Sequence, residues 1–275
     1  MGARSRFIEV EGGRLYVEQD GEGTAVVFLH PGLWDCRTWD EQFSLFADRY
    51  HVLRYDARGY GRSSRIEPGV AYSSVRDLLA VLDDAGIERA TLIGCSMGGA
   101  NEIDFTLEHP ERVRALVLVA AGTNGFDAGP ELEAEWEVWW AERQAPVDAA
   151  IEAGDLERAQ DLRLRTMWAQ LGTDDPAGRR IREIAFDNLQ ELTMDESAQE
   201  QIDPPAFERL GEIAVPTLVL PADHDPPEMG WICSTIANRI PGARLVRIPD
   251  TDHVINLRRP AEFNRVVLGF LADML

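Results

Sequence analysis

The segment GCSMG at residues 94–98 holds the side chain best suited to covalent chemistry, the hydroxyl of Ser96. Residues 91–93 favour a strand, and the residues after the segment favour a helix. A G-x-S-x-G pattern between strand and helix is typical of a nucleophile elbow, a sharp turn that exposes a serine. Glycine is needed at positions 94 and 98 because a Cβ there would collide with neighbouring backbone. The same pentapeptide also fits an ordinary turn with a capping serine, so the rest of the chain must decide.

A serine hydroxyl at neutral pH needs a base to take its proton, and the base needs a carboxylate to orient it. His224 and His253 both follow predicted strand ends, where sheets of this kind place their chemistry. We predict His253 as the base because it follows the last strand and leaves an earlier strand end to supply the acid. Asp225 fits that acid, with Asp223 as the alternative. The order nucleophile, acid, base along the chain strengthens the catalytic interpretation of Ser96.

The remaining histidines and the acids beside His253 have structural interpretations. His51 opens a predicted strand and His109 ends a predicted helix, and His30 is expected to organise a loop through hydrogen bonds. Asp250 and Asp252 are too near His253 in sequence to reach its far nitrogen easily, so we interpret them as loop caps.

Two backbone amides are predicted to stabilise the oxyanion that forms when the serine attacks. The amide of Met97 lies at the start of a helix, where amides are free to donate. A second amide is expected from the loop HPGLW at residues 30–34, which follows a continuous apolar run. Gly32 in this loop allows close approach of the backbone to a ligand.

The predicted reactive residues lie at the ends of alternating strands and helices. Apolar runs that predict strands buried on both faces alternate with amphipathic segments that predict helices. The alternation favours an α/β fold with a parallel sheet covered on both faces, preceded by a β-hairpin. The predicted strands cover residues 6–10, 14–19, 25–29, 51–56, 90–93, 113–121, 215–220 and 244–248, and the predicted helices cover 37–48, 72–85, 100–108 and a final segment from Pro260.

The alternation stops between residues 122 and 211, where helical, charged segments replace buried strands. An insertion of this size between two sheet strands predicts a helical lid over a core formed by residues 1–121 and 212–275. Its tryptophans either line an apolar pocket or pack within the lid. The residues expected to contact substrate are Leu33, Trp34, Trp136, Trp139, Trp140 and Trp168.

Composition narrows the classes of partner. The 275 residues are 45% hydrophobic and can bury one large core, and the formal net charge is -21. All 27 basic side chains are arginine, against 48 acidic ones, and such a surface repels phosphate backbones and anionic lipid heads. We therefore expect a small-molecule substrate, no nucleic-acid or membrane partner, and a monomer or homodimer.

Neither a metal nor a cofactor is expected. The glycine-containing loop at residues 56–64 lacks the third glycine of a dinucleotide site. The three cysteines, Cys36, Cys95 and Cys233, lack metal-type spacing and are interpreted as unpaired thiols, with Cys95 in a packing role. Together with the absence of a signal-like or transmembrane apolar run, this favours the cytoplasm.

The chain resembles the α/β-hydrolase fold superfamily, in the lid-bearing group of serine esterases, lactonases and C–C hydrolases. The stretches that carry the resemblance are VVFLHPGLWDCRTW, RYDARGYGRSS, LIGCSMGGA, LEHPERVRALVLV, PTLVLPADHD and IPDTDHVINLRRPAEF. The resemblance implies a mostly parallel eight-stranded sheet, helices on both faces and a helical lid after the sixth strand. It also implies a catalytic triad of Ser96 as nucleophile, Asp225 as acid and His253 as base, with the amides of Gly32 and Met97 as the oxyanion hole.

Two departures from the relatives concern the site. The sequence His30-Pro31-Gly32 replaces the usual His-Gly-x, which leaves the oxyanion donor of this loop open between Gly32 and Leu33. Asn101 and Glu102 occupy helix positions that are small or apolar in relatives. Glu102 is expected either as a buried carboxyl near the site or as a solvent-facing side chain.

These observations predict a cofactor-free serine hydrolase that cleaves a small to medium ester or lactone through an acyl-enzyme. Serine at the elbow argues against the dehalogenase and epoxide hydrolase branches of the superfamily. C–C bond hydrolysis and perhydrolysis would use the same triad. A ligand-sensing relative with negligible turnover is the alternative from another class, because fold does not fix function.

Overall fold

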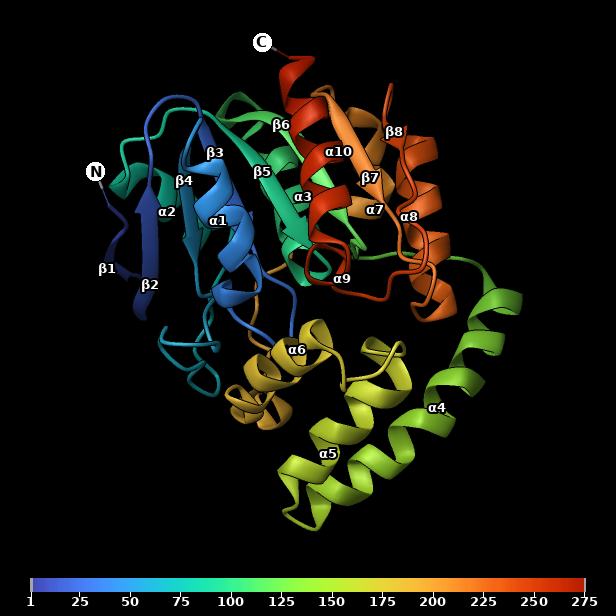
Figure 1. Cartoon of the computed structure of the whole chain (residues 1–275). Helices are drawn as coiled ribbons and strands as arrows, with labels where there is room; N and C mark the ends of the chain where they lie inside the picture. The colour runs from blue at the N-terminus through green and yellow to red at the C-terminus, as the bar shows by residue number, and fades with distance from the viewer. Residues whose placement is uncertain (1, 275) are drawn as a thin grey trace.

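The computed structural model describes residues 2–274 and contains one sheet of eight strands with helices on both faces (Figure 1). The spatial order is β1-β2-β4-β3-β5-β6-β7-β8. Pairing is parallel from β4 through β8 and antiparallel for β1 with β2 and β2 with β4. The predicted fold class is therefore confirmed. The strands are β1 Arg4–Val10, β2 Gly13–Asp20, β3 Ala25–Leu29, β4 His51–Tyr55, β5 Ala90–Cys95, β6 Val113–Val119, β7 Thr217–Leu220 and β8 Arg244–Leu245.

Continuous apolar strands form because both faces of the sheet are buried. All five residues of β3 are buried, and their side chains alternate between two apolar clusters. Val27 and Leu29 join the cluster under α2 (Ser74–Asp84), α3 (Met97–Glu108) and α8 (Pro227–Arg239). Val26 and Phe28 join the cluster under α1 (Asp40–Phe46), α9 (Ile255–Arg258) and α10 (Pro260–Ala272).

Two predicted elements differ in the structure. The predicted helix at 37–48 begins as a 3-10 turn, η1 Cys36–Trp39, before α1 continues it. The predicted strand at 244–248 contracts to β8, whose two residues are exposed. As the edge strand, β8 has a single neighbour, β7, and no second strand to hold its extension.

A helical insertion separates β6 from β7 and lies beyond one end of the sheet (Figure 1). Its own apolar cluster is formed by Val147, Ala150, Ala159 and Met167. In the part of the chain that the structure describes, no helix is both long and apolar enough to cross a bilayer. The elements between β6 and β7 are α4 Pro130–Glu152, α5 Leu156–Arg163, the π-helical turn η3 Leu164–Trp168, α6 Pro176–Phe186, η4 Leu189–Thr193, α7 Ala206–Arg209 and η5 Leu210–Glu212, with η2 Pro110–Arg112 before β6.

Candidate active site

Ser96 lies at a strained turn between β5 and α3. Its φ is +53°, a left-handed conformation that side chains other than glycine rarely adopt. The Ser96 N–H donates to the carbonyl of Val119 at 3.0 Å, and the Ser96 carbonyl accepts from the amides of Ala100 and Gly122 at 3.0 and 3.1 Å. These bonds hold the turn in place, as strained backbone at functional sites requires.

The glycines around Ser96 are there for space, as the sequence predicts. A Cβ built on Gly94 would lie 2.5 Å from the carbonyl carbon of Gly98. A Cβ on Gly98 would overlap the carbonyl group of Leu29, at the end of the neighbouring strand β3. The helix can therefore approach the sheet closely enough to form the turn only with glycine at both positions.

His253 and Asp225 meet on neighbouring loops after β7 and β8. Nδ1 of His253 lies 2.8 and 3.0 Å from the two carboxylate oxygens of Asp225. Their side chains are 2% and 3% exposed. Burial raises the pKa of Asp225, and the nearby His253 opposes this rise. Asp223 instead accepts from the amide of Asp250 at 3.0 Å, so the structure brings Asp225 and not Asp223 to the imidazole.

A hydrogen bond joins the loop of His253 to the strand that carries Ser96. The thiol of Cys95, the last residue of β5, donates to the His253 carbonyl at 3.5 Å. All three cysteines are buried, free thiols, which agrees with the prediction. Within residues 2–274, no protein group forms a hydrogen bond with the Ser96 hydroxyl. Among the described residues, the structure thus brings Asp225 to His253 but does not join His253 to Ser96 by a hydrogen bond.

The loop after β3 contains two backbone amides, those of Gly32 and Leu33, that can donate a hydrogen bond to a ligand. Leu33 has a φ of +70°, and within the described residues neither its amide nor that of Gly32 donates to a protein acceptor. His30 supports the loop from below. The amide of Ala57 donates to its Nε2 at 2.9 Å, so its Nδ1–H donates to the carbonyl of Pro31 at 2.8 Å. The predicted organising role of His30 is confirmed.

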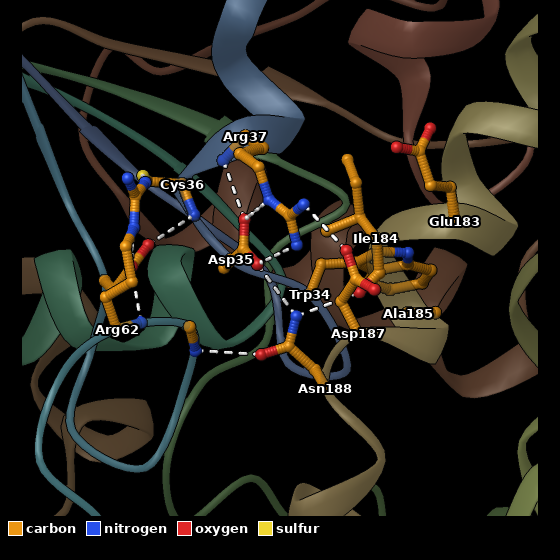
Figure 2. A network of polar contacts seen from close by, with 12 residues as sticks. Trp34, Asp35, Cys36, Arg37, Arg62, Glu183, Ile184, Ala185, Asp187 and Asn188 are labelled. Atoms are coloured by element: carbon orange, nitrogen blue, oxygen red, sulfur yellow. Dashed lines mark hydrogen bonds and ion pairs between the residues drawn. The ribbon is translucent and has the colours of Figure 1, made fainter.

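A polar network fastens this loop to the insertion (Figure 2). Asn188 donates to the carboxylate of Asp35 at 2.8 Å and accepts from the amide of Gly61 at 2.8 Å. Arg37 bonds to both carboxylate oxygens of Asp35 at 2.9 and 2.7 Å. Burial alone would raise the pKa of Asp35, but the bonds from Arg37 and Asn188 outweigh it and lower that pKa.

Asp35, Cys36 and Asp56 bring potential metal-binding atoms within 4.8 Å of one another. Their chemistry does not fit a metal site, because the protein already occupies the donors. The carboxylate of Asp56 accepts from the amides of Cys36 and Arg62 at 3.0 and 2.8 Å. Burial raises the pKa of the Cys36 thiol well above its ordinary value, which disfavours the thiolate that a metal needs. These residues instead form a buried hydrogen-bonded connection between the loops after β3 and β4.

The interpretation of Asp252 as a loop cap is wrong. Its fully buried carboxylate pairs with Arg258 at 2.7 and 2.9 Å and accepts from the amide of Leu171 at 3.2 Å. Arg258 also donates to the carbonyl of Gly172 at 2.6 Å and pairs with Asp175 at 3.1 Å. Asp252 thus anchors the insertion next to His253, directly through Leu171, 81 positions away in the sequence, and indirectly through Arg258, six positions away.

Three predicted substrate-contact tryptophans form a row that ends at the imidazole. The ring centroid of Trp168 lies 4.4 Å from that of His253, Trp140 lies 5.6 Å from Trp168, and Trp139 lies 5.1 Å from Trp140. The indole nitrogen of Trp140 donates to Glu228 at 2.5 Å. The indole nitrogen of Trp168 is buried and has no partner among the described residues.

The other two predicted tryptophans lie in packed surroundings. Trp136 contacts Trp231 and Phe126 with centroid distances of 5.6 and 6.3 Å. Trp34 is fully buried, and its indole nitrogen donates to the carbonyl of Ile181 in α6 at 2.9 Å. Leu33 shares the apolar cluster of Trp34.

Sequence reasoning missed a small polar pocket next to Met97. A cavity of about 20 Å³ is lined by Met97 and Asn101 of α3, by Tyr60 and Tyr72, and by Glu196 of the insertion. A larger surface cavity of about 720 Å³ lies elsewhere, between the N-terminal hairpin and α1. The only sequence signal for the small pocket is the unusual polar residue at position 101.

Glu102, the other unusual helix residue, is fully buried. Neither of its carboxyl oxygens has a hydrogen-bond partner that meets normal geometry. Burial raises the pKa of Glu102 well above its ordinary value, which favours the neutral acid. The first of the two expectations for Glu102 is therefore the one that the structure supports.

The chain matches the model of a known protein family over most of its length. The model of the "Alpha/beta hydrolase family" matches residues 26–266. A 2-hydroxy-6-oxononadienedioate/2-hydroxy-6-oxononatrienedioate hydrolase of Klebsiella pneumoniae is 30% identical, covering 98% of this chain and 96% of that protein. A protein of Azorhizobium caulinodans, provisionally named carbamate hydrolase RutD, is 29% identical over 94% of this chain and 96% of its own length.

Two solved structures with a similar fold are described as lactone-cleaving enzymes. The structure described as "Est816 as an N-Acyl homoserine lactone degrading enzyme" is 28% identical, with a TM-score of 0.74 over 96% of this chain and all of that one. The enol-lactonase from Burkholderia xenovorans LB400 has a TM-score of 0.78 at 24% identity, over 97% of this chain and all of that one, and this likeness concerns the fold alone.

Proposed function

Because the chain belongs to the alpha/beta hydrolase family and is a hydrolase, we propose that it cleaves a small to medium carboxylic ester or lactone with Ser96, His253 and Asp225. One observation carries the proposal. The buried imidazole of His253 holds both carboxylate oxygens of Asp225 at Nδ1, on a loop that is bonded to the strand of Ser96. Serine activation needs a base with an orienting acid, and here the loop of that base is bonded to the residue before a strained serine.

In the proposed mechanism His253 removes the proton from Ser96 as the hydroxyl oxygen attacks the substrate carbonyl carbon. Asp225 keeps the proton of the imidazole on Nδ1, so Nε2 is free to accept the serine proton. The tetrahedral oxyanion accepts hydrogen bonds from the amides of Met97 and of Gly32 or Leu33. His253 then protonates the leaving alcohol, and water releases the acid from the acyl-enzyme by the same steps in reverse.

We propose that residues 122–211 act as a lid over a core formed by residues 1–121 and 212–275. Support comes from the fastenings between the insertion and the loops of the site, at Asn188 with Asp35 and at Leu171 with Asp252. The row of tryptophans that ends at His253 gives the lid an apolar inner surface. An apolar group on one side of the substrate carbonyl fits such a surface.

A second candidate is hydrolysis of a C–C bond in a vinylogous diketone, favoured by the names of relatives such as the one from Klebsiella pneumoniae. It would use the same three residues, as would perhydrolysis of a carboxylic acid. Est816 is described as degrading an N-acyl homoserine lactone, which favours the lactone. Identification of products by mass spectrometry separates these reactions. C–C cleavage gives a carboxylic acid and a fragment with a new C–H bond, and ester cleavage gives an acid and an alcohol. Lactone opening gives a single hydroxy acid, and perhydrolysis gives a peracid.

The experiment that tests the proposal combines labelling with turnover. A fluorophosphonate probe is expected to modify Ser96, located by peptide mass mapping, and short p-nitrophenyl esters are expected to be hydrolysed. Ser96→Ala should abolish both while the circular dichroism spectrum stays unchanged. Turnover retained by Ser96→Ala would refute the mechanism. Labelling with negligible turnover of any ester would instead favour C–C hydrolysis or a ligand-sensing role.

A further inference from the structure

The small polar pocket beside Met97 has no role in the proposed mechanism. It borders the loop of Gly32, since a Cβ built on that glycine would lie 3.6 Å from the Tyr60 hydroxyl. We propose that this pocket binds a neutral or cationic hydrogen-bond donor on the substrate, a hydroxyl or an ammonium group, and rejects a carboxylate. The inference rests on the proposed function, because it concerns a substrate held at Ser96.

Asn101 is the first observation in support. The residue is 6% exposed and lines the pocket, yet within residues 2–274 its side-chain amide forms no hydrogen bond. Nearly all buried polar groups in proteins have a partner, and an exception next to a reactive serine indicates a ligand. The amide offers both a donor and an acceptor, so it can bind a hydroxyl group in either direction.

The charged side chains that line the pocket disfavour the binding of an anion. The guanidinium of the pocket, Arg58, is buried and already bound to the two oxygens of Asp77 at 2.8 and 3.1 Å, and to the carbonyl of Glu11 at 2.9 Å. The Arg58–Asp77 pair carries no net charge. Nε and Nη2 of Arg58 are already bound, so they are not available to bind a substrate carboxylate through two hydrogen bonds. Glu196 therefore gives the pocket a net negative charge.

Glu196 directs that charge toward the site. Glu196 is an exposed residue of the insertion, and its carboxylate accepts from the hydroxyl of Tyr60 at 3.4 Å. Arg163 is a second guanidinium that acts on Glu196, and it forms an ion pair with Glu191. Arg163 offsets only part of the negative charge of Glu191 and Glu196, so this region attracts a substrate ammonium and repels a substrate carboxylate.

The size of the pocket limits what enters. A volume of about 20 Å³ holds one group of the size of a water molecule, such as a hydroxyl or an ammonium. The dienedioates named for the relatives end in carboxylates, which this pocket is not built to receive. The substrates that it favours are esters or lactones with a hydroxyl or amine a few bonds from the carbonyl.

The test compares four methyl esters of similar length that differ in their ends: 3-hydroxypropanoate, 3-aminopropanoate, butanoate and monomethyl succinate. A longer series, each with three more methylenes, covers a deeper position of the carbonyl. In at least one series, kcat/KM measured by pH-stat should be about tenfold or more higher for the hydroxyl and ammonium esters than for the carboxylate ester. Equal rates for the carboxylate and hydroxyl esters in both series would overturn the inference.

Variants identify the source of the preference. Glu196→Gln should remove the advantage of the ammonium ester over the apolar one and reduce the penalty of the carboxylate ester. Asp195→Asn is the matched control, because it removes one charge from the same segment at a fully exposed residue outside the pocket. Identical effects of the two substitutions would mean that general surface charge sets the preference and would refute the pocket.

Calorimetric titration of the same esters into Ser96→Ala separates this inference from the proposed function. Preferential binding of the hydroxyl and ammonium esters, without turnover by the intact protein, would support the pocket and refute ester hydrolysis. Fast hydrolysis of all four esters without preference would support the hydrolysis and refute the pocket.

Discussion

Nδ1 of His253 lies within 3.0 Å of both carboxylate oxygens of Asp225, in surroundings from which water is almost excluded. This carboxylate selects the imidazole tautomer in which Nε2 is the acceptor. Replacement of the acid by its amide would allow the other tautomer, in which Nε2 carries the proton and no longer acts as a base.

Asp225→Asn should therefore lower kcat by about 10⁴-fold if the proposed triad operates, the magnitude known for the same change in another serine hydrolase. Burst kinetics with a p-nitrophenyl ester give the rate of acylation. Asp223→Asn is the control, since Asp223 contacts the amide of Asp250 and not His253, and its kcat should stay near that of the unmodified protein. A loss in the control that equals the loss in Asp225→Asn would contradict the assignment of the acid.

Two glycine substitutions separate crowding from conformational freedom. Gly98→Ala should lower the free energy of unfolding by about 1–3 kcal/mol, because the added Cβ would overlap the carbonyl of Leu29. Gly230→Ala in α8 meets no atom within 4 Å and should raise it by about 0.5–1 kcal/mol. Urea denaturation followed by circular dichroism measures both. A neutral effect at position 98 would show that the elbow can shift to make room.

Glu102 should make stability depend on pH. Its folded pKa is raised by burial above the unfolded value near 4.5, so its contribution is fully present below pH 4.5 and is lost as pH rises toward the folded pKa. Glu102→Gln, which keeps a neutral side chain of the same size, should remove this loss. Its advantage over the unmodified protein should therefore grow as pH rises above 4.5 and level off above the folded pKa of Glu102. The exposed Glu67→Gln should show no such trend, and a constant difference for Glu102→Gln would mean that the carboxyl stays solvated.

Asn188 should hold the insertion against the loops of the site. Asn188→Ala removes the bonds to Asp35 and Gly61 and should destabilise the protein by about 1–3 kcal/mol, because their buried groups lose a partner. Limited proteolysis should then cut within residues 122–211 faster than in the unmodified protein. Gln144→Ala, at an exposed site on α4, is the control and should leave the cleavage rate unchanged. Equal cleavage rates for both variants would contradict a fastening role for Asn188.

Much of the fold could be predicted from the sequence because its signals are local. Each buried strand is an unbroken apolar run, and the elbow needs glycine two positions before and after Ser96 for steric reasons. The choice of Asp225 over Asp223 agrees with the contact to His253, because the order of residues along the chain follows from the fold.

The missed features depend on contacts between distant segments. The anchoring role of Asp252 depends on Leu171, which lies 81 positions away in the sequence. The polar pocket joins Tyr60 to Glu196, 136 positions later, and no local pattern marks such a pair. The contraction of β8 follows from its place at the sheet edge, which composition does not reveal.

The contact between Trp168 and His253 gives the protein an optical reporter. An indole ring 4.4 Å from an imidazole loses emission when that imidazole becomes an electron-accepting cation. The difference in intrinsic fluorescence between the unmodified protein and Trp168→Phe therefore reports on changes at His253. The emission of Trp168 can therefore be used to follow the surroundings of His253 in the absence of substrate.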